Sequence, residues 1–165
     1  MKRLILMRHA KSDWNNPALP DHDRPLNKRG RRAATALGAW LRAHDLAPDE
    51  ILCSTATRTQ ETCARLALPR APELHAALYL AEPPEMLDLL RAASGDTVLM
   101  IGHNPGIAEF AASLTATPPD HDRFEDYPTG ATLVAAFGNG TWRDLRPGTG
   151  RVQHFVIPRE LTDTP

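Results

Sequence analysis

Short runs of apolar residues recur along the chain, and they predict the strands of a sheet. The first run covers residues 3–7 (RLILM), and the most continuous one covers residues 97–101 (TVLMI). Runs of this length without polar alternation are typical of strands that are buried on both faces of a parallel sheet. Further extended segments are predicted at 50–54, 76–80, 131–137, 141–145 and 152–157.

Stretches with apolar residues three and four positions apart lie between these runs and predict helices. Asn27 can cap the first helix, and Thr57 and Gln60 have the spacing of a capping box. Asn104 can cap a further helix, with Pro105 at its first helical position. The predicted helices cover 28–43, 57–67, a stretch opened by Pro83 and Pro84, and a stretch from 105 to about 114.

The alternation of predicted strands and helices favours an α/β fold. It predicts a three-layer α/β/α sandwich with a mainly parallel central sheet. The chain has 165 residues, which suits one domain, and the sequence contains no linker that would divide residues 1–165. The segments 15–25 and 116–130 are rich in Asp and Pro and are interpreted as loops.

Composition and charge exclude several classes of protein. The net charge of −1 gives no overall field that would attract nucleic acid or a membrane surface. The two cysteines are neither a disulfide framework nor a metal motif, and we expect the protein in the cytoplasm. The densest basic cluster is Arg29, Arg31 and Arg32, and we interpret it as a solvated helix face.

Basic or titratable side chains follow three of the predicted strands. Arg8 and His9 follow the first strand, and Arg58 lies in the first turn of the helix after the segment 50–54. His103 follows the segment 97–101. Because the carboxyl ends of parallel strands and the N-termini of the following helices meet at one edge of the sheet, we expect these side chains to converge. No carboxylate falls at the three junctions, and the sequence therefore predicts a pocket for a phosphate dianion.

These residue types suit phosphoryl transfer. Arginine binds two phosphate oxygens at once and keeps its charge at any working pH. A neutral imidazole can attack phosphorus near pH 7, and a second, protonated imidazole can neutralise a phosphoryl oxygen in the transition state. Each junction alone is more often structural, and a GHNPG turn is a good helix start. The three together point to a site.

The loop before the first helix contains the string PDHDR, which could suggest a metal site. Asp21, His22 and Asp23 are adjacent in sequence and lack the spacing of metal ligands on a helix, and so we expect no metal. We expect Arg24 to pair with a neighbouring aspartate and to hold the loop over the site. The string recurs at 119–123, but two copies do not make a repeat architecture.

Four motifs surround these residues in a fixed order. They are RHAKSDWN at 8–15, RPLNKRG at 24–30, STATRTQET at 54–62 and GHNP at 102–105. Their pattern and order resemble those of the histidine phosphatase superfamily, in its phosphoglycerate mutase-like branch. The strings RHAKSDW and DHDRPL, with the chain length, resemble the short SixA-like phosphohistidine phosphatases most. The resemblance covers residues 4–106 and implies the histidine phosphatase fold.

The resemblance also implies roles for individual residues. His9 would be the nucleophile and would carry a phosphohistidine intermediate. Arg8 and Arg58 would clamp the phosphoryl group, and His103 would be the second, charge-stabilising histidine. Ala10 replaces the usual glycine, and its methyl group excludes a strongly positive φ.

Further site residues are candidates with weaker support. Asn15 falls on a phosphate-contacting asparagine of longer members, and Ser12 is a second additional candidate for phosphate binding. No motif matches the glutamate that protonates the leaving group in longer members, and the nearest carboxylates are Glu82, Glu85 and Asp13. A positioned general acid typically accelerates the reaction by about 10²–10⁴-fold. Because imidazole leaves phosphorus more readily than an alkoxide does, a missing acid favours phosphohistidine, or another activated phosphoryl donor, over sugar phosphates.

The sequence therefore predicts a metal-independent phosphatase without a cofactor, acting on phosphohistidine in a protein. Two alternatives remain. One is a small-molecule phosphomonoesterase that uses the same site, and the other is a phosphate-binding module without catalysis. The expected partner is a phosphorylated protein or a small phosphorylated substrate, and neither nucleic acid nor a membrane is expected.

Overall fold

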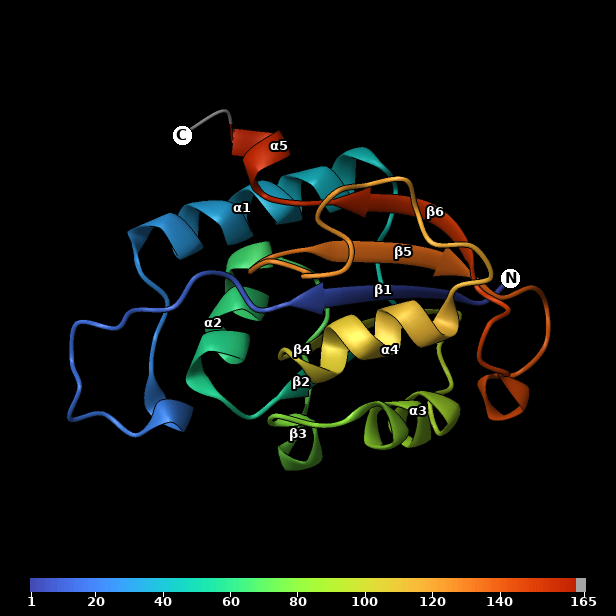
Figure 1. Ribbon diagram of the computed structural model, residues 1–165, viewed down its shortest axis with the longest axis horizontal. Coiled ribbons are helices and arrows are strands. Elements are labelled where there is room, and N and C mark those ends of the chain that lie inside the picture. The colour runs from blue at the N-terminus through green and yellow to red at the C-terminus, as the bar shows by residue number, and fades with distance from the viewer. Residues whose placement is uncertain (163–165) are drawn as a thin grey trace.

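A six-stranded sheet forms the centre of the computed structural model, which describes residues 1–162 (Figure 1). The strands are β1 (Arg3–Arg8), β2 (Glu50–Ser54), β3 (Glu73–His75), β4 (Thr97–Gly102), β5 (Thr132–Ala136) and β6 (Arg151–Val156). Their order in the sheet is β3-β2-β4-β1-β5-β6. Neighbours from β3 to β1 are parallel, whereas β5 is antiparallel to β1 and β6. The last three residues of the predicted domain lie outside the described part.

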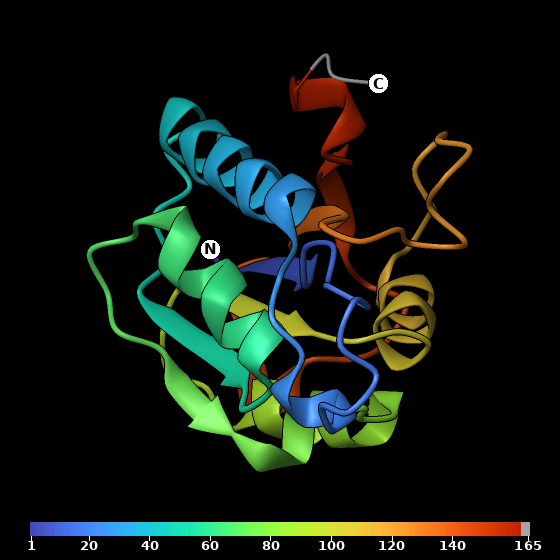
Figure 2. The same cartoon turned by 90° about the vertical axis from the view of Figure 1, so that its left-hand side faces the viewer.

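Helices cover both faces of this sheet (Figure 2). On one face, Ile5 and Met7 share a core with α1 (Lys28–Ala43) and α2 (Thr57–Leu66). On the other face, Leu4 and Leu6 share a core with α3 (Pro83–Arg91) and α4 (Gly106–Leu114). The predicted three-layer sandwich is therefore confirmed. No helix in residues 1–162 is long and apolar enough to cross a membrane. A short helix, α5 (Arg159–Thr162), follows β6.

The helix at α1 follows the predicted pattern closely. Leu37 and Leu41 are fully buried on its apolar face, and Asn27 is its N-cap. The side chain of Asn27 accepts a hydrogen bond of 2.8 Å from the backbone N–H of Gly30. A cap of this kind satisfies one of the free N–H groups in the first turn.

Two predicted extended segments are wrong. Residues Ala76–Leu78 form a single 3₁₀ turn, η2, and the short strand β3 lies just before it. The apolar residues there reflect burial of Leu78 rather than the alternation of a strand. Residues Trp142–Asp144 form another 3₁₀ turn, η3, because the Trp142 ring is buried and its Nε1 donates to the carbonyl of Gly95 at 2.7 Å.

The start of α2 differs from the predicted capping box. Its N-cap is Ala56, whose backbone N–H donates to Oγ of Ser54 at 3.2 Å. Gln60 does not reach back to Thr57, and its Nε2 donates to the carbonyl of Thr55 at 2.7 Å. The end of β2 and the start of α2 are thus tied by the side chain of Ser54.

Three parallel strands end in line. Arg8 at the end of β1 pairs with Gly102 at the end of β4, and Cys53 of β2 pairs with Ile101 of β4. In Figure 1 these carboxyl ends face the left-hand side of the molecule, where the chain from β1 to α1 also lies. That segment contains a third 3₁₀ turn, η1 (Asp21–Asp23). The register therefore brings the segments after β1, β2 and β4 to one edge.

Candidate active site

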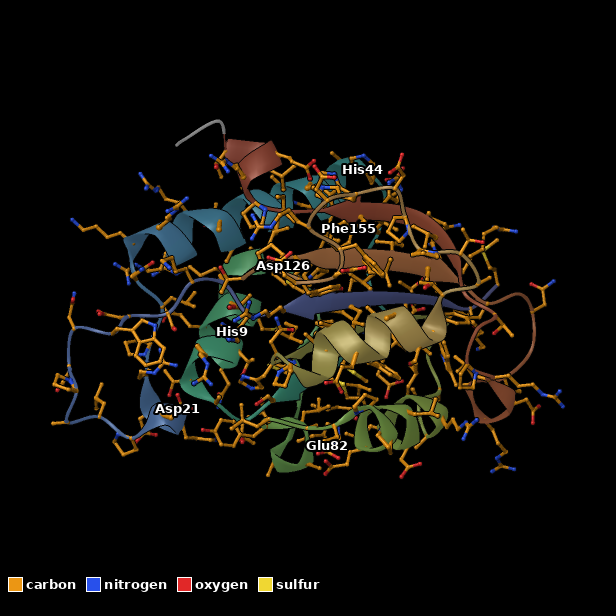
Figure 3. All side chains as sticks on the ribbon, viewed as in Figure 1. His9, Asp21, His44, Glu82, Asp126 and Phe155 are labelled. Carbon is orange, nitrogen blue, oxygen red and sulfur yellow. The ribbon has the colours of Figure 1, made fainter. Side chains whose placement is uncertain are left out.

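The four basic residues predicted from the strand ends lie together at this edge. Nε of Arg58 lies 3.3 Å from Nε2 of His9, and the ring centroids of His9 and His103 are 5.3 Å apart. One cavity of about 310 Å³ is lined by all four residues, Arg8, His9, Arg58 and His103. Figure 3 labels His9 at this edge. The rest of the lining consists of Lys11, Ser12, Trp14, Arg24, Leu80, Asn104 and Thr129.

The imidazole of His9 is held in one tautomer. Its Nδ1 lies 2.7 Å from the carbonyl oxygen of Ala10. Because a carbonyl only accepts, Nδ1 carries the proton and Nε2 keeps a lone pair, which accepts from Nε of Arg58. Burial lowers the pKa of His9 to about 3, the bond to Ala10 opposes this, and the nearby cations lower the pKa further. His9 is therefore neutral at pH 7.

The imidazole of His103 lies beside both a hydroxyl and a cation. Its Nε2 lies 2.8 Å from Oγ of Ser54, at the end of β2. Burial first, and then the positive charge of Arg58, lowers the pKa of His103 to about 3. His103 is therefore neutral at pH 7 in the protein without a bound anion, because desolvation and a neighbouring cation both disfavour a second positive charge. The predicted protonated imidazole concerns the transition state and stays a prediction.

Two buried nitrogen atoms at the cavity have no hydrogen-bond partner among residues 1–162. They are Nε of Arg8 and Nδ1 of His103. Nη1 of Arg8 donates to the carbonyl of Tyr127 at 3.2 Å. Burial and the charge of Arg58 lower the pKa of Arg8. Buried polar groups are costly without partners, and an anion in the cavity is the kind of ligand that satisfies such groups.

A buried threonine supports the backbone beside His9. Oγ1 of Thr62 accepts from the backbone N–H of Ala10 at 3.0 Å and donates to the carbonyl of Arg58 at 2.7 Å. The hydroxyl therefore links the residue that fixes the His9 tautomer to the helix that carries Arg58. The sequence showed Thr62 within a motif, but its partner lies 52 positions away.

The loop before α1 reaches into the site through Asp21. The carbonyl of Asp21 accepts from Nη1 of Arg58 at 2.7 Å, and its Oδ2 accepts from Nη2 at 3.0 Å and from the hydroxyl of Tyr79. The Tyr79 hydroxyl, Arg24 and Arg58 hold the pKa of Asp21 well below its usual range. Arg24 pairs with Asp21 at 2.9 Å, as predicted, and also donates to Ser12. The links from Asp21 to Arg58 and Tyr79 were not predicted.

The remaining predicted residues do not line the cavity, with the exception of Ser12. Asn15 is exposed, and its backbone N–H donates to Oδ1 of Asp13 at 2.7 Å. Oε1 of Glu85 accepts from the backbone N–H of Glu82 at 3.2 Å, at the start of α3 (Figure 3). The structure therefore brings none of the three candidate proton donors to the site. Among the described residues, no carboxylate lines the cavity.

The predicted helix cap at Asn104 is also wrong. The helix α4 begins at Gly106, and Pro105 is its N-cap. Nδ2 of Asn104 donates to the carbonyls of Asp126 and Tyr127, at 2.9 and 3.1 Å. The side chain thereby ties the loop at 126–127 to the cavity wall instead of capping the helix.

The loop at 20–24 uses its polar groups for contacts within the protein. Nε2 of His22 lies 2.9 Å from Oγ1 of Thr55, and Asp21 binds the arginines described above. Within residues 1–162, no group of three or more His, Cys, Asp or Glu residues is arranged to hold a metal ion.

Comparisons with known sequences agree with these features. A profile of the histidine phosphatase superfamily (branch 1) matches residues 4–82. The Mycobacterium tuberculosis protein named uncharacterized protein Rv1276c is 36% identical over 160 residues, and the match covers 93% of this chain and 100% of the relative. An Arabidopsis thaliana chloroplastic protein, At3g52155, is 30% identical over 176 residues, covering 95% of this chain and 78% of the relative.

Solved structures are similar over nearly the whole chain. A Nakamurella multipartitia protein proposed to be the phosphohistidine phosphatase SixA is 34% identical, with a TM-score of 0.85 over 95% of this chain and 96% of that chain. The protein histidine phosphatase SixA in complex with tungstate shares the fold, with a TM-score of 0.77 at 22% identity over 97% of this chain and 99% of that chain. The chain therefore belongs to the histidine phosphatase superfamily, in its SixA-like branch.

Proposed function

We propose that this phosphatase removes the phosphoryl group from phosphohistidine in a protein and carries it briefly on His9. The observation that supports this best is the state of the His9 ring. Its Nδ1–H is held by the carbonyl of Ala10, and its Nε2 lone pair faces the guanidinium of Arg58 at 3.3 Å. The lone pair becomes available for attack on phosphorus once a bound phosphoryl oxygen takes over the N–H of Arg58, and a neutral imidazole beside a cation is suited to that attack.

In the first step, the lone pair on Nε2 of His9 attacks phosphorus. The bond from phosphorus to the imidazole nitrogen of the substrate breaks, and its electron pair leaves with that imidazole, which takes a proton from solvent. Arg8 and Arg58 bind the non-bridging oxygens and stabilise their charge. A bound dianion offsets the charge of Arg58 and so favours the protonated form of His103, which then donates to a phosphoryl oxygen.

In the second step, water attacks the phosphorus on His9. The bond between phosphorus and Nε2 breaks, its electron pair returns to the ring, and the proton lost by water passes to solvent. Because Nδ1–H stays on the carbonyl of Ala10, the phosphorylated ring carries a positive charge and is a good leaving group. Inorganic phosphate then departs from Arg8 and Arg58.

The lining of the cavity supports phosphohistidine as the substrate class. It includes no carboxylate among the described residues. The Asp21 carboxylate that binds Arg58 has a pKa well below its usual range, and so it carries no proton to give to a leaving alkoxide near pH 7. A general acid at that position typically accelerates the departure of an alkoxide by about 10²–10⁴-fold. The name given to the Nakamurella relative, phosphohistidine phosphatase SixA, supports the same substrate class. We further expect the protein to act without a metal and in the cytoplasm.

The proposal is tested by comparing substrates in the presence of EDTA. A phosphohistidine peptide, p-nitrophenyl phosphate and a sugar phosphate are offered to the protein, and we expect a kcat/KM at least tenfold higher for the peptide than for the sugar phosphate. A preference for the sugar phosphate would favour the small-molecule alternative. Loss of all activity in EDTA would contradict the metal-independent mechanism.

The intermediate is tested separately. Protein mixed rapidly with substrate and denatured in alkali is expected to carry acid-labile phosphate on His9, located by mass spectrometry. His9→Ala is expected to lose turnover by at least about a thousandfold while still binding inorganic phosphate through Arg8 and Arg58. Acid-stable phosphate on Ser12 or Ser54 would contradict the assignment of the nucleophile. Phosphate binding by the wild-type protein without turnover would favour a non-catalytic module.

A further inference from the structure

A second pocket adjoins the cavity that contains His9. Its volume is about 210 Å³, and it shares Lys11 and Thr129 with that cavity. It lies between the start of α1, the loop before β5 and the start of α5. Its lining comprises Lys11, Arg29, Arg32, Ala33, Arg123, Pro128, Thr129, Ile157, Pro158, Arg159 and Thr162.

This second pocket is lined by five basic residues. Arg123 pairs with Asp126 at 2.8 Å. The side chains of the other four form no ion pair or hydrogen bond with any residue of the described chain: Lys11, Arg29, Arg32 and Arg159. Like charges around one pocket repel one another, and a bound anion relieves that repulsion. The basic composition therefore favours an anionic ligand.

Within the arginine cluster, Arg29 and Arg32 are exposed, as a solvated helix face predicts, whereas Arg31 is half-buried. Arg31 donates to the carbonyl of Leu26 at 3.0 Å and does not line the second pocket. Arg29 and Arg32 point to this pocket from one side of α1. The sequence could not divide the cluster in this way, because the opposite wall comes from residues about a hundred positions later.

The walls of the second pocket are tied to the backbone that carries the nucleophile. The carbonyl of Lys11, two positions after His9, accepts from the backbone N–H of Asn27 at 3.1 Å. It also lies so close to Gly30 that a Cβ there would come within 2.1 Å of it. On the other side, the backbone N–H of Gly130 donates to the carbonyl of His9 at 2.9 Å. A group held in the second pocket is thus fixed in position relative to the His9 ring.

The surroundings favour a protein over a small molecule as the source of that anion. Arg29, Arg32 and Arg159 are exposed, in contrast to the buried Arg58 at the phosphoryl site. Two large apolar side chains at the neighbouring cavity are also exposed, Trp14 at 71% and Leu80 at 52%. Exposed aromatic, aliphatic and arginine side chains around a site are typical of protein recognition surfaces.

We propose that the second pocket binds an acidic side chain, aspartate or glutamate, near the phosphorylated histidine of a protein substrate. The inference rests on the proposed function, because it assigns specificity to the same site. Arg29 and Arg32 attract the carboxylate and act as specificity residues without touching the reacting atoms. Since these cations are exposed, their contribution is modest individually and is weakened by salt.

The test compares two phosphohistidine peptides that differ only in their flanking residues, aspartate or asparagine. Wild-type protein is expected to show a kcat/KM at least about fivefold higher for the acidic peptide, and this advantage decreases as ionic strength rises. Arg29→Ala combined with Arg32→Ala is expected to remove the advantage, while kcat/KM for the neutral peptide and for p-nitrophenyl phosphate stays within twofold. Lys28→Ala is the matched control, because Lys28 is exposed on the same helix turn and does not line the second pocket.

The possible outcomes separate the two proposals. Equal turnover of both peptides by the wild-type protein would overturn the inference about the second pocket and leave the proposed function intact. An equal loss on all three substrates in the double variant would also overturn it, because the arginines would then act on folding or on the general field. A wild-type preference for a small bisphosphate over both peptides would overturn the protein origin of the anion. Failure to hydrolyse either peptide, with p-nitrophenyl phosphate still hydrolysed, would overturn the proposed function itself.

Discussion

The guanidinium of Arg58 donates to both the backbone carbonyl and the carboxylate of Asp21, at 2.7 and 3.0 Å. The third nitrogen, Nε, is thereby directed toward Nε2 of His9. Asp21 belongs to a loop that is 37 positions away from Arg58 in the sequence. The orientation of the cation beside the proposed nucleophile therefore depends on an anionic residue outside the three strand ends.

Asp21→Asn tests the contact between Asp21 and Arg58 with two measurements. The value of kcat reports the orientation of Arg58, and the inhibition constant for phosphate reports the negative charge of Asp21. The variant keeps the backbone carbonyl that binds Arg58 but removes the negative charge. We expect kcat for p-nitrophenyl phosphate to fall about tenfold, because Arg58 is less firmly oriented. We expect the inhibition constant for inorganic phosphate to fall by about two- to fivefold, because one repulsive charge near the anion is gone.

The control for Asp21→Asn is Asp23→Asn. Asp23 belongs to the same 3₁₀ turn, is exposed and contacts only His22 at 3.6 Å among the ion pairs of the described chain. The substitution Asp23→Asn also removes one negative charge, but Asp23 does not contact Arg58. Equal effects of the two substitutions on kcat would contradict an orienting role for Asp21.

The low pKa values of His9 and His103 make folding stability depend on pH. Both pKa values are lowered from 6.5 to about 3 in the folded protein, mainly by burial. Between pH 6.5 and 3 the unfolded chain therefore binds more protons at these positions than the folded protein does, so stability rises with pH across this window and falls as pH drops. Urea unfolding at pH 7, 5.5 and 4.5 is expected to show this loss.

Substituting either histidine by glutamine is expected to reduce that dependence on pH. In the wild-type protein, the ring NMR signals of His9 and His103 are expected to stay those of neutral imidazole down to pH 5. Addition of phosphate at pH 6 is expected to shift the His103 signals toward the protonated form. Identical slopes of stability against pH in the wild-type protein and in both variants would contradict the assigned pKa values.

Several parts of the fold and site could be predicted from the sequence because they depend on neighbours in the chain. The apolar run at 97–101 predicts a buried strand from its own residues, and it forms β4. Asn27 caps α1 by accepting from the backbone N–H of Gly30, three positions later. The convergence of Arg8, Arg58 and His103 also follows from local order, since parallel strands end at a common edge.

Other parts depend on contacts that no local pattern encodes. The link from Thr62 to Ala10 spans 52 positions, and the hydroxyl of Tyr79 reaches Asp21 across 58. The neutral state of His103 depends on burial by the whole fold and on the charge of Arg58. The wrongly predicted strand at 76–80 has the same origin. Leu78 is buried in the core from a 3₁₀ turn, so its apolar side chain does not reflect the alternation of a strand.

Thr62→Val tests the support beneath the nucleophile. Valine has nearly the shape of threonine, but it leaves the buried N–H of Ala10 without its acceptor, and so we expect a loss of about 1–3 kcal/mol in the free energy of unfolding. Because Ala10 orients the His9 ring, kcat is expected to fall about tenfold with little change in KM. Steady-state kinetics and urea unfolding measure the two effects.

Two further variants complete this test. Thr62→Ser keeps the hydroxyl and is expected to restore most of kcat. Thr35→Val is the matched control, because the exposed Thr35 hydroxyl donates to the carbonyl of Arg31, one turn earlier in its helix, just as Thr62 donates to Arg58. A loss of kcat in Thr35→Val as large as that in Thr62→Val would contradict a specific role for the buried hydroxyl.

The final prediction concerns Gly106, the first residue of α4. A Cβ at this position would lie 1.8 Å from the carbonyl oxygen of Ala81, which belongs to the backbone and cannot rotate away. Gly106→Ala is therefore expected to lower the free energy of unfolding by about 1–3 kcal/mol and to lower kcat, because α4 must shift next to His103. Gly140→Ala is the control, since a Cβ at Gly140 would meet nothing within 4 Å. Urea unfolding of both variants measures the difference, and equal stability would show that the segment before α3 moves aside at no cost.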